Sequence, residues 1–132
     1  MIDDQPLRQK AQKTLALFAG RLQQVPGAMP QMLVAAGATL GVRHQIIIAG
    51  QPDADDTRAL LREVRRRYLP HRVLLLLDAG PGQHFLSECN PFFKSLSRLD
   101  GRATAYVCEN FACQLPTTDP AMLDRLLTGR VV

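Results

Sequence analysis

The chain has 132 residues, of which 46% are hydrophobic and 21% charged, and it carries a formal net charge of +4. That length is enough for one ordinary domain with a core of its own, and the composition lies outside the ranges of disordered and fibrous proteins. The most strongly apolar run outside the helical patterns, Val73 to Leu77, is far shorter than the roughly 20 residues of a membrane-spanning helix, so we expect no membrane partner.

The N-terminal segment and the cysteines bear on the compartment. Residues Met1 to Lys10 are polar and mixed in charge, whereas a secretory signal is basic and then apolar, so we expect a cytoplasmic protein. The three cysteines are an odd number. In a protein without a secretory signal, such a count predicts reduced thiols and no disulfide framework.

The first third of the chain has the apolar spacing of two helices. Apolar residues recur at steps of three and four from Pro6 to Gln24, and a second helical pattern follows Pro30. Between them Val25, Pro26 and Gly27 break the helix. Residues 1–42 are therefore predicted to form a helical hairpin.

From His44 onward the pattern alternates between strands and helices, which predicts a small α/β domain over residues 43–132. The expected strands are Ile46 to Ala49, Val73 to Leu77, and a weaker one from Ala103 to Val107. Each is separated from the next by helical spacing, and Asp119 with Pro120 should start a last helix. This order is typical of right-handed β-α-β units, so we expect a three-stranded parallel sheet with flanking helices.

Three runs in this half carry a resemblance to a known family. They are RATAYVCENFACQLPTTDP at Arg102–Pro120, IIIAGQPD at Ile46–Asp53 and TRALLREVRRRYLP at Thr57–Pro70, together with Asp100 and Gly101. These runs resemble the C-terminal region of the thioredoxin-domain-containing protein family of the spermatogenesis-associated type. They occur in the same order along the chain as in that family. The resemblance extends from about Arg8 to Leu127.

The resemblance implies a larger architecture than these residues hold. The family has an N-terminal thioredoxin-like domain, then a toroid of helical hairpins like that of sugar epimerases and glycosidases, then an α/β tail. Residues 1–42 would correspond to the last hairpin of that (α/α) toroid and residues 43–132 to the tail. Because the thioredoxin-like domain and most of the toroid are absent from the 132 residues, no redox or sugar-site residue is carried over.

Polar residues that follow the expected strands indicate a candidate ligand site. In a parallel sheet the loops after all three strands would meet at the carboxyl edge, where open α/β folds bind ligands. Glycines ahead of a helix there could bring N–H groups to a phosphate, and a histidine near an aspartate could act as a general base. The candidate ligand-binding residues are Gly50, Asp53, Asp78, Gly80, Gly82, His84 and Asn110.

Cys108 and Cys113 are the candidate redox residues, since they flank a short segment just after the third expected strand. Four residues separate them, whereas redox dithiols and zinc hairpins usually have two, and no further cysteine or histidine pair completes a metal site. Small buried thiols are the alternative interpretation. We expect no metal and no cofactor.

Arg58, Arg62 and Arg65 to Arg67 form a basic stretch on one expected helix. They lie on its polar side beside Glu63 and have no aromatic residues between them, so a solvated face is a better interpretation than a nucleic-acid interface. We expect no nucleic-acid partner.

These observations favour a non-catalytic structural or interaction module, and we do not expect the isolated chain to be an enzyme. Met29, Met32, Leu33 and Leu40 give the hairpin an apolar face that neighbouring helices should cover, which predicts a homo-oligomer or another protein chain as partner. The alternative is a redox domain, or one that binds a phosphorylated or sugar-like ligand, using the carboxyl edge and the pair Cys108 and Cys113.

Overall fold

A computed structural model describes residues 4–41, 43–109 and 112–128. The chain divides into two compact units, Met1–Val42 and Arg43–Val132, each of which is described by itself. No helix in the described ranges is both long and apolar enough to cross a membrane.

Unit 1 consists of two helices and a single 3-10 turn between them. Helix α1 spans Gln5–Gln24, the turn η1 spans Pro26–Ala28, and α2 spans Pro30–Leu40. The carboxylate of Asp4 caps α1 by accepting a hydrogen bond from the N–H of Leu7 at 2.9 Å. Pro30 occupies the first turn of α2, where its missing N–H costs nothing. The predicted pair of helices is confirmed.

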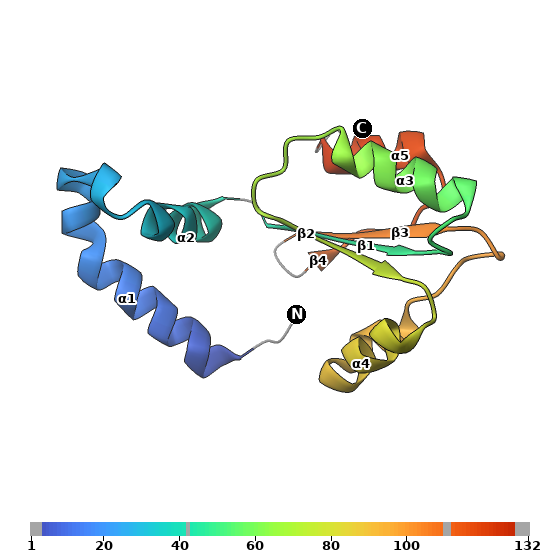
Figure 1. The fold of residues 1–132 in the computed structure, drawn as a ribbon, viewed down its shortest axis with the longest axis horizontal. Helices are drawn as coiled ribbons and strands as arrows, with labels where there is room; N and C mark the ends of the chain where they lie inside the picture. Colours follow the sequence, from blue (N-terminus) through green and yellow to red (C-terminus); the bar gives the residue numbers. More distant parts are fainter. Residues whose placement is uncertain (1–3, 42, 110–111, 129–132) are drawn as a thin grey trace. The chain divides into compact units, whose positions relative to one another are not determined.

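Unit 2 is a sheet with helices on both faces (Figure 1). Its strands are β1 (His44–Ala49), β2 (Arg72–Leu77), β3 (Thr104–Glu109) and β4 (Ala112–Cys113), in the order β2-β1-β3-β4. Its helices are α3 (Asp55–Arg65), α4 (Pro81–Cys89) and α5 (Pro120–Leu127), with a 3-10 turn η2 at Pro91–Ser95.

The prediction of a three-stranded parallel sheet is wrong. Strands β1 and β2 are parallel, but β3 runs antiparallel to β1, and β4 adds a fourth, antiparallel strand at the edge. The sheet is therefore four-stranded and mixed. The register places Thr104, the first residue of β3, opposite Ala49, the last residue of β1.

The reason for this reversal lies in the connection between β2 and β3. A parallel crossover needs a segment that runs back along the whole sheet before the next strand starts. Here α4 has only nine residues, and η2 folds back against it. The chain therefore returns to the same end of the sheet at which it left β2. Strand β3 then has to start at the carboxyl end of β1.

Two apolar layers hold unit 2 together, one on each face of the sheet. On one face α3 and α5 pack over Ile46, Ile48 and Val107. On the other, Phe93 and Leu96 from the η2 region cover Ile47 and Ala49. Strand β1 is thus buried on both faces, as its unbroken apolar run predicts.

A carboxylate in the first turn of α3 ties that helix to the start of β3. Asp56 accepts a hydrogen bond from the N–H of Ala103 at 2.7 Å and another from the N–H of Thr57 at 2.8 Å. The bond from Ala103 is the main reason that the pKa of Asp56 lies below its ordinary value, because it stabilises the ionised form.

We expect Asp56→Asn to make the free energy of unfolding less dependent on pH. A carboxyl group with a lowered folded-state pKa contributes stability that is fully present above its unfolded pKa and is lost as the pH falls through the folded one. At pH 7 the free energy of unfolding of the variant should be about 1 kcal/mol lower. The effect is small because water screens the exposed carboxylate. Urea unfolding between pH 3 and 7 measures this.

The neighbouring carboxylate Asp55 provides the matched control, since it is also exposed in the first turn of α3 but does not bond to Ala103. Asp55→Asn removes the same charge but keeps the bond to Ala103, so it should destabilise the protein less at pH 7. An equal decrease in the free energy of unfolding of both variants would show that the bond from Ala103 to Asp56 does not account for the effect.

Candidate functional site

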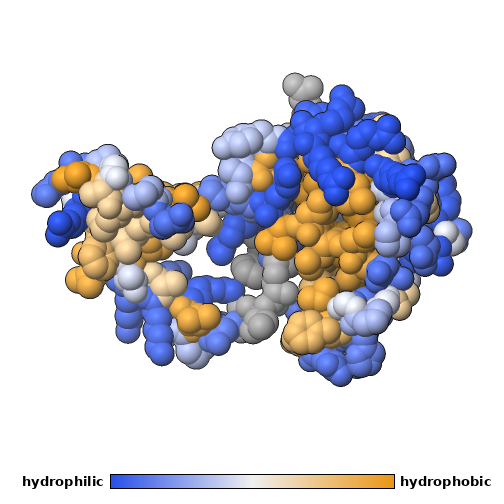
Figure 2. Space-filling model, in the orientation of Figure 1, coloured by the Kyte–Doolittle hydropathy of each residue, from blue (hydrophilic) through white to orange (hydrophobic). Residues whose placement is uncertain are grey.

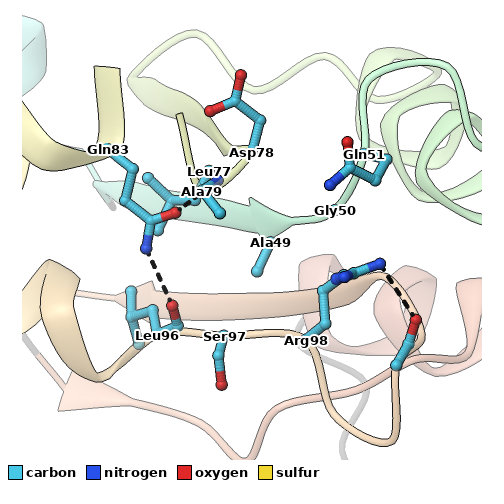
Figure 3. A pocket seen from close by; sticks show the side chains of 11 residues that line it. Ala49, Gly50, Gln51, Leu77, Asp78, Ala79, Gln83, Leu96, Ser97 and Arg98 are labelled. Carbon is cyan, nitrogen blue, oxygen red and sulfur yellow. Dashed lines mark hydrogen bonds between the residues drawn. The ribbon is translucent and has the colours of Figure 1, made fainter. Parts of the chain in front are cut away.

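A cleft of about 300 Å³ lies at the carboxyl ends of β1 and β2. Figure 3 shows the side chains around it. The lining residues come from the ends of the two parallel strands, from α4 and from the loop ahead of β3: Ala49, Gly50, Gln51, Leu77, Asp78, Ala79, Gln83, Leu96, Ser97, Arg98 and Gly101.

The loops after β1 and β2 meet here because these strands are parallel and in register. The N–H of Gly50 donates to the carbonyl of Leu77 at 2.9 Å, which extends the ladder by one bond beyond the strands. A Cβ at position 50 would overlap Oγ1 of the fully buried Thr57 on α3. Glycine at this position therefore permits close approach of the strand end to the helix.

Gln83 on α4 fixes the wall on the β2 side. Its Nε2 donates to the carbonyl oxygens of Phe93 at 3.3 Å and Leu96 at 3.2 Å, and its Oε1 accepts from the N–H of Ala79 at 3.0 Å. Ala79 has a φ of 63°, in the left-handed region that residues other than glycine seldom adopt. The side chain of Gln83 thus holds the loop after β2 in a costly conformation.

Two charged side chains lie on the walls of the cleft. Asp78 accepts a hydrogen bond from the N–H of Gly80 at 2.8 Å through one of its two oxygens. Arg98 makes one long hydrogen bond, 3.5 Å from Nη1 to the carbonyl of Gly101, as Figure 3 shows. A guanidinium has five N–H donors, so Arg98 retains donors for an anionic group. Ala49, Leu77 and Leu96 supply apolar surface.

The candidate ligand-binding residues lie in different places. Gly50 and Asp78 line the cleft, and Gly80 caps α4 beside it. Asp53 is exposed and forms an ion pair with Arg58 at 3.1 Å.

Gly82 and His84 do not line the cleft. Gly82 lies within α4 with open space around it. His84 is exposed, and its Nδ1 lies 3.6 Å from Glu88, one turn further along α4, so its charged neighbour is Glu88 and not Asp78. Asn110 lies outside the described residues.

The carboxyl end of β3 does not lie at the cleft, contrary to the parallel arrangement that we expected. Because β3 is antiparallel to β1, the last residues of β3 lie beside the first residues of β1, where Cys108 faces Gln45. The segment at the cleft is instead the loop that precedes β3, with Ser97 and Arg98. The cleft and the pair Cys108 and Cys113, which the alternative function combined, are therefore at opposite ends of the strands.

Cys108 and Cys113 are joined in a disulfide, whereas we expected reduced thiols. They are directly opposite each other on β3 and β4, with Cα atoms 3.9 Å apart, because the chain reverses between them. Cys108 is buried and Cys113 exposed, and Cys89 on α4 is a free, exposed cysteine. Within the described residues, no group of three or more His, Cys, Asp or Glu side chains could hold a metal ion.

The sequence interpretation missed Arg98, although one signal was present. Asp100 and Gly101 have φ values of 50° and 73°, and Leu99 pairs with Arg102 across them, as in a tight hairpin turn. An Asp-Gly pair of this kind favours an antiparallel reversal, which would have indicated that the chain turns back at the cleft.

The basic stretch on α3 is partly neutralised. Arg66 bonds to Glu63 at 3.2 Å, and Arg67 pairs with Asp124 on α5. Arg58 pairs with Asp53. The guanidinium groups along α3 border a shallow surface groove above Leu61.

Comparison with known proteins gives one group of relatives. Spermatogenesis-associated protein 20 of Homo sapiens is 46% identical over 113 residues, and the proteins of that name from Rattus norvegicus and Mus musculus are 45% identical. No protein-family model and no solved structure matches the chain. The matched region is 86% of this chain but only 14% of each relative. The chain is therefore a homologue of a short part of spermatogenesis-associated protein 20.

Proposed function

We propose that the chain is a non-catalytic interaction module that corresponds to the C-terminal region of a thioredoxin-domain-containing protein. Unit 1 provides the docking surface, and the sheet of unit 2 is the folded body that carries it. The observation behind this proposal is that unit 1 has two well-defined helices but almost no core.

The burial of unit 1 is too small to stabilise it alone. Leu22 is the one buried residue among its described positions, and no residue of α2 is buried. The exposed apolar side chains include Leu17 at 79%, Val34 at 62% and Leu40 at 88%. An isolated helix of 11 residues, the length of α2, is marginal in water, and most helical stability comes from packing of an apolar face. Further contacts are therefore needed to cover these helices.

The apolar surface has a definite place at the junction of the two helices. A groove of about 370 Å³ runs between them and is lined mostly by aliphatic groups. Ala11 and Leu15 line it from α1, and Met32 and Ala35 from α2. The small residues on both helices let another helix approach closely, which is the geometry of helix-in-groove recognition.

The relatives suggest where the covering helices come from. They are about seven times longer than the region that matches this chain, since that region is 14% of their length. The resemblance of residues 1–42 to the last hairpin of a helical toroid indicates that neighbouring hairpins cover the groove. In the isolated chain, we infer that a second copy takes their place.

Replacing Met32 and Leu33 together by Glu should lower the solution mass of the protein. Met32 lines the groove and Leu33 is 41% exposed beside it, so two carboxylates would make burial of this surface unfavourable. Light scattering of the parent and the variant measures the mass, and circular dichroism checks that the helices persist.

A matched control carries the same added charge on exposed polar positions of α1, as Gln23→Glu with Gln24→Glu. This control should keep the mass of the parent. A mass that is unchanged by Met32→Glu with Leu33→Glu would contradict docking through the groove.

A second candidate function is binding of a small anionic ligand, phosphorylated or sugar-like, in the cleft. Arg98 supports it, since a guanidinium with free donors suits phosphate or carboxylate groups. Asp78 on another wall retains one carboxylate oxygen that could accept bonds from ligand hydroxyls. The cleft volume is at the lower end of the range for small-molecule sites.

Glycerol 3-phosphate is a suitable probe, because it has an anionic group and two hydroxyl groups. Calorimetric titration should show binding to the parent, and Arg98→Met should weaken it about tenfold or more, as expected for loss of a charge-assisted pair. Arg66→Met removes an exposed arginine elsewhere and should leave the affinity unchanged. Equal affinity in all three proteins, or no binding, would argue against the cleft as an anion site.

A further inference from the structure

Strand β2 forms an open edge of the sheet. It pairs with β1 on one side, and it is the outermost strand in the order β2-β1-β3-β4. Within the described residues, the backbone groups of positions 73–76 have no hydrogen bond beyond the ladder with β1. Half of the N–H and C=O groups of this strand thus face outward without a partner, which makes the edge a template for another strand.

This edge lacks the features that usually prevent strand addition. Native proteins protect long edges with charged residues, prolines, bulges or a covering segment. Positions 73–77 are Val-Leu-Leu-Leu-Leu, paired with β1 in an unbroken register. Val73 is 42% exposed, and Leu74, Leu75 and Leu76 are only half-buried. Figure 2 shows an apolar surface in this region of unit 2, between the polar surfaces of α3 and α4.

The two ends of the strand carry opposite charges. Arg72 begins the apolar run, and Asp78 directly follows it. One Nη of Arg72 donates to the carbonyl of Arg67, so the guanidinium lies beside the strand and keeps other donors. Asp78 is exposed and has one oxygen bonded to Gly80. An antiparallel neighbour of the same sequence would place a cation opposite an anion at both ends.

We propose that β2 pairs antiparallel with β2 of a second copy of this chain, in the register that sets Arg72 opposite Asp78 of the other copy. In this register Val73 faces Leu77, Leu74 faces Leu76, and Leu75 faces itself on the two-fold axis. The result is one continuous sheet of eight strands.

The alternation of side chains supports this register. Leu74 and Leu76 belong to the layer under α3 and α5, whereas Leu75 and Leu77 belong to the layer on the other face. Directly opposed residues of antiparallel strands point to the same face, so each apolar layer continues into its counterpart. A shift by one residue would put each layer against the wrong face. The two-fold relation also satisfies the self-complementarity of an isologous interface.

This interface is independent of the groove in unit 1. Its tests are therefore made in the background of Met32→Glu with Leu33→Glu, in which self-association through the groove is disfavoured. A failure of the groove proposal leaves the outcome at β2 unaffected, because each surface has its own substitutions.

Cysteine cross-linking tests the register. In a Cys89→Ser background, Leu75→Cys puts two thiols across the two-fold axis, and mild oxidation should give a disulfide-linked dimer. Val73→Cys is the matched control on the same face and is more exposed. Its two copies would be separated by four residues along the strands, about 13 Å, which is too far for a disulfide. Cross-linking of Val73→Cys as fast as Leu75→Cys, or of neither, overturns the proposal.

Charge exchange tests the pairing of Arg72 with Asp78. Arg72→Asp alone and Asp78→Arg alone each put like charges opposite at both ends, and each should raise the dimer dissociation constant about tenfold or more. An equal mixture of the two variants restores both opposite-charge pairs in a mixed dimer, and so does the double variant in one chain. Analytical ultracentrifugation of these samples should show recovery of the dimer. The proposal is overturned if the protein with only Met32→Glu and Leu33→Glu is a monomer. It is also overturned if the mixture has a dissociation constant no lower than that of either variant alone.

Discussion

Strand β1 is the element on which the rest of unit 2 depends. All six of its residues pair with a neighbour on each side, with β2 in parallel and with β3 antiparallel. Both of its faces are buried, under α3 and α5 on one side and under the η2 region on the other. The direction of each neighbour then decides which loops meet at which edge of the sheet.

The mixed direction separates features that a parallel sheet would bring together. The loop after β2 meets the loop after β1 because these strands are parallel, and the loop ahead of β3 meets them because β3 is antiparallel. The cleft thus contains Asp78 and Arg98, while the disulfide of Cys108 and Cys113 lies at the opposite edge. A mechanism that used both the cleft and the disulfide would have to act over the whole length of the strands.

Unit 1 and strand β2 share a physical property, which is apolar surface that their own unit leaves uncovered. In unit 1 the helices form because of local spacing and capping, yet α2 buries none of its residues. In β2 the ladder with β1 is complete, yet the outer edge has no partner in the described part of the chain. Both surfaces belong to a chain that matches only 14% of the length of its relatives.

The sequence by itself determined the local elements of this protein. The spacing of apolar residues located α1 and α2, the apolar runs located β1 and β2, and Asp119 with Pro120 marked the start of α5. It also singled out Gly50 and Asp78, two residues that line the cleft. These features depend on residues close together in the chain, so they can be recognised from periodicity and turn chemistry.

The tertiary structure decided the direction of β3, the presence of β4, and with them the composition of the cleft. Nothing in the run from Thr104 to Glu109 distinguishes a parallel strand from an antiparallel one, because both bury the same side chains. The choice depends on how α4 and η2 pack against each other and on the turn at Asp100 and Gly101, which together return the chain to the edge it had left. Arg98 reaches the cleft, and Cys108 is carried away from it, as a consequence of packing between segments distant in sequence.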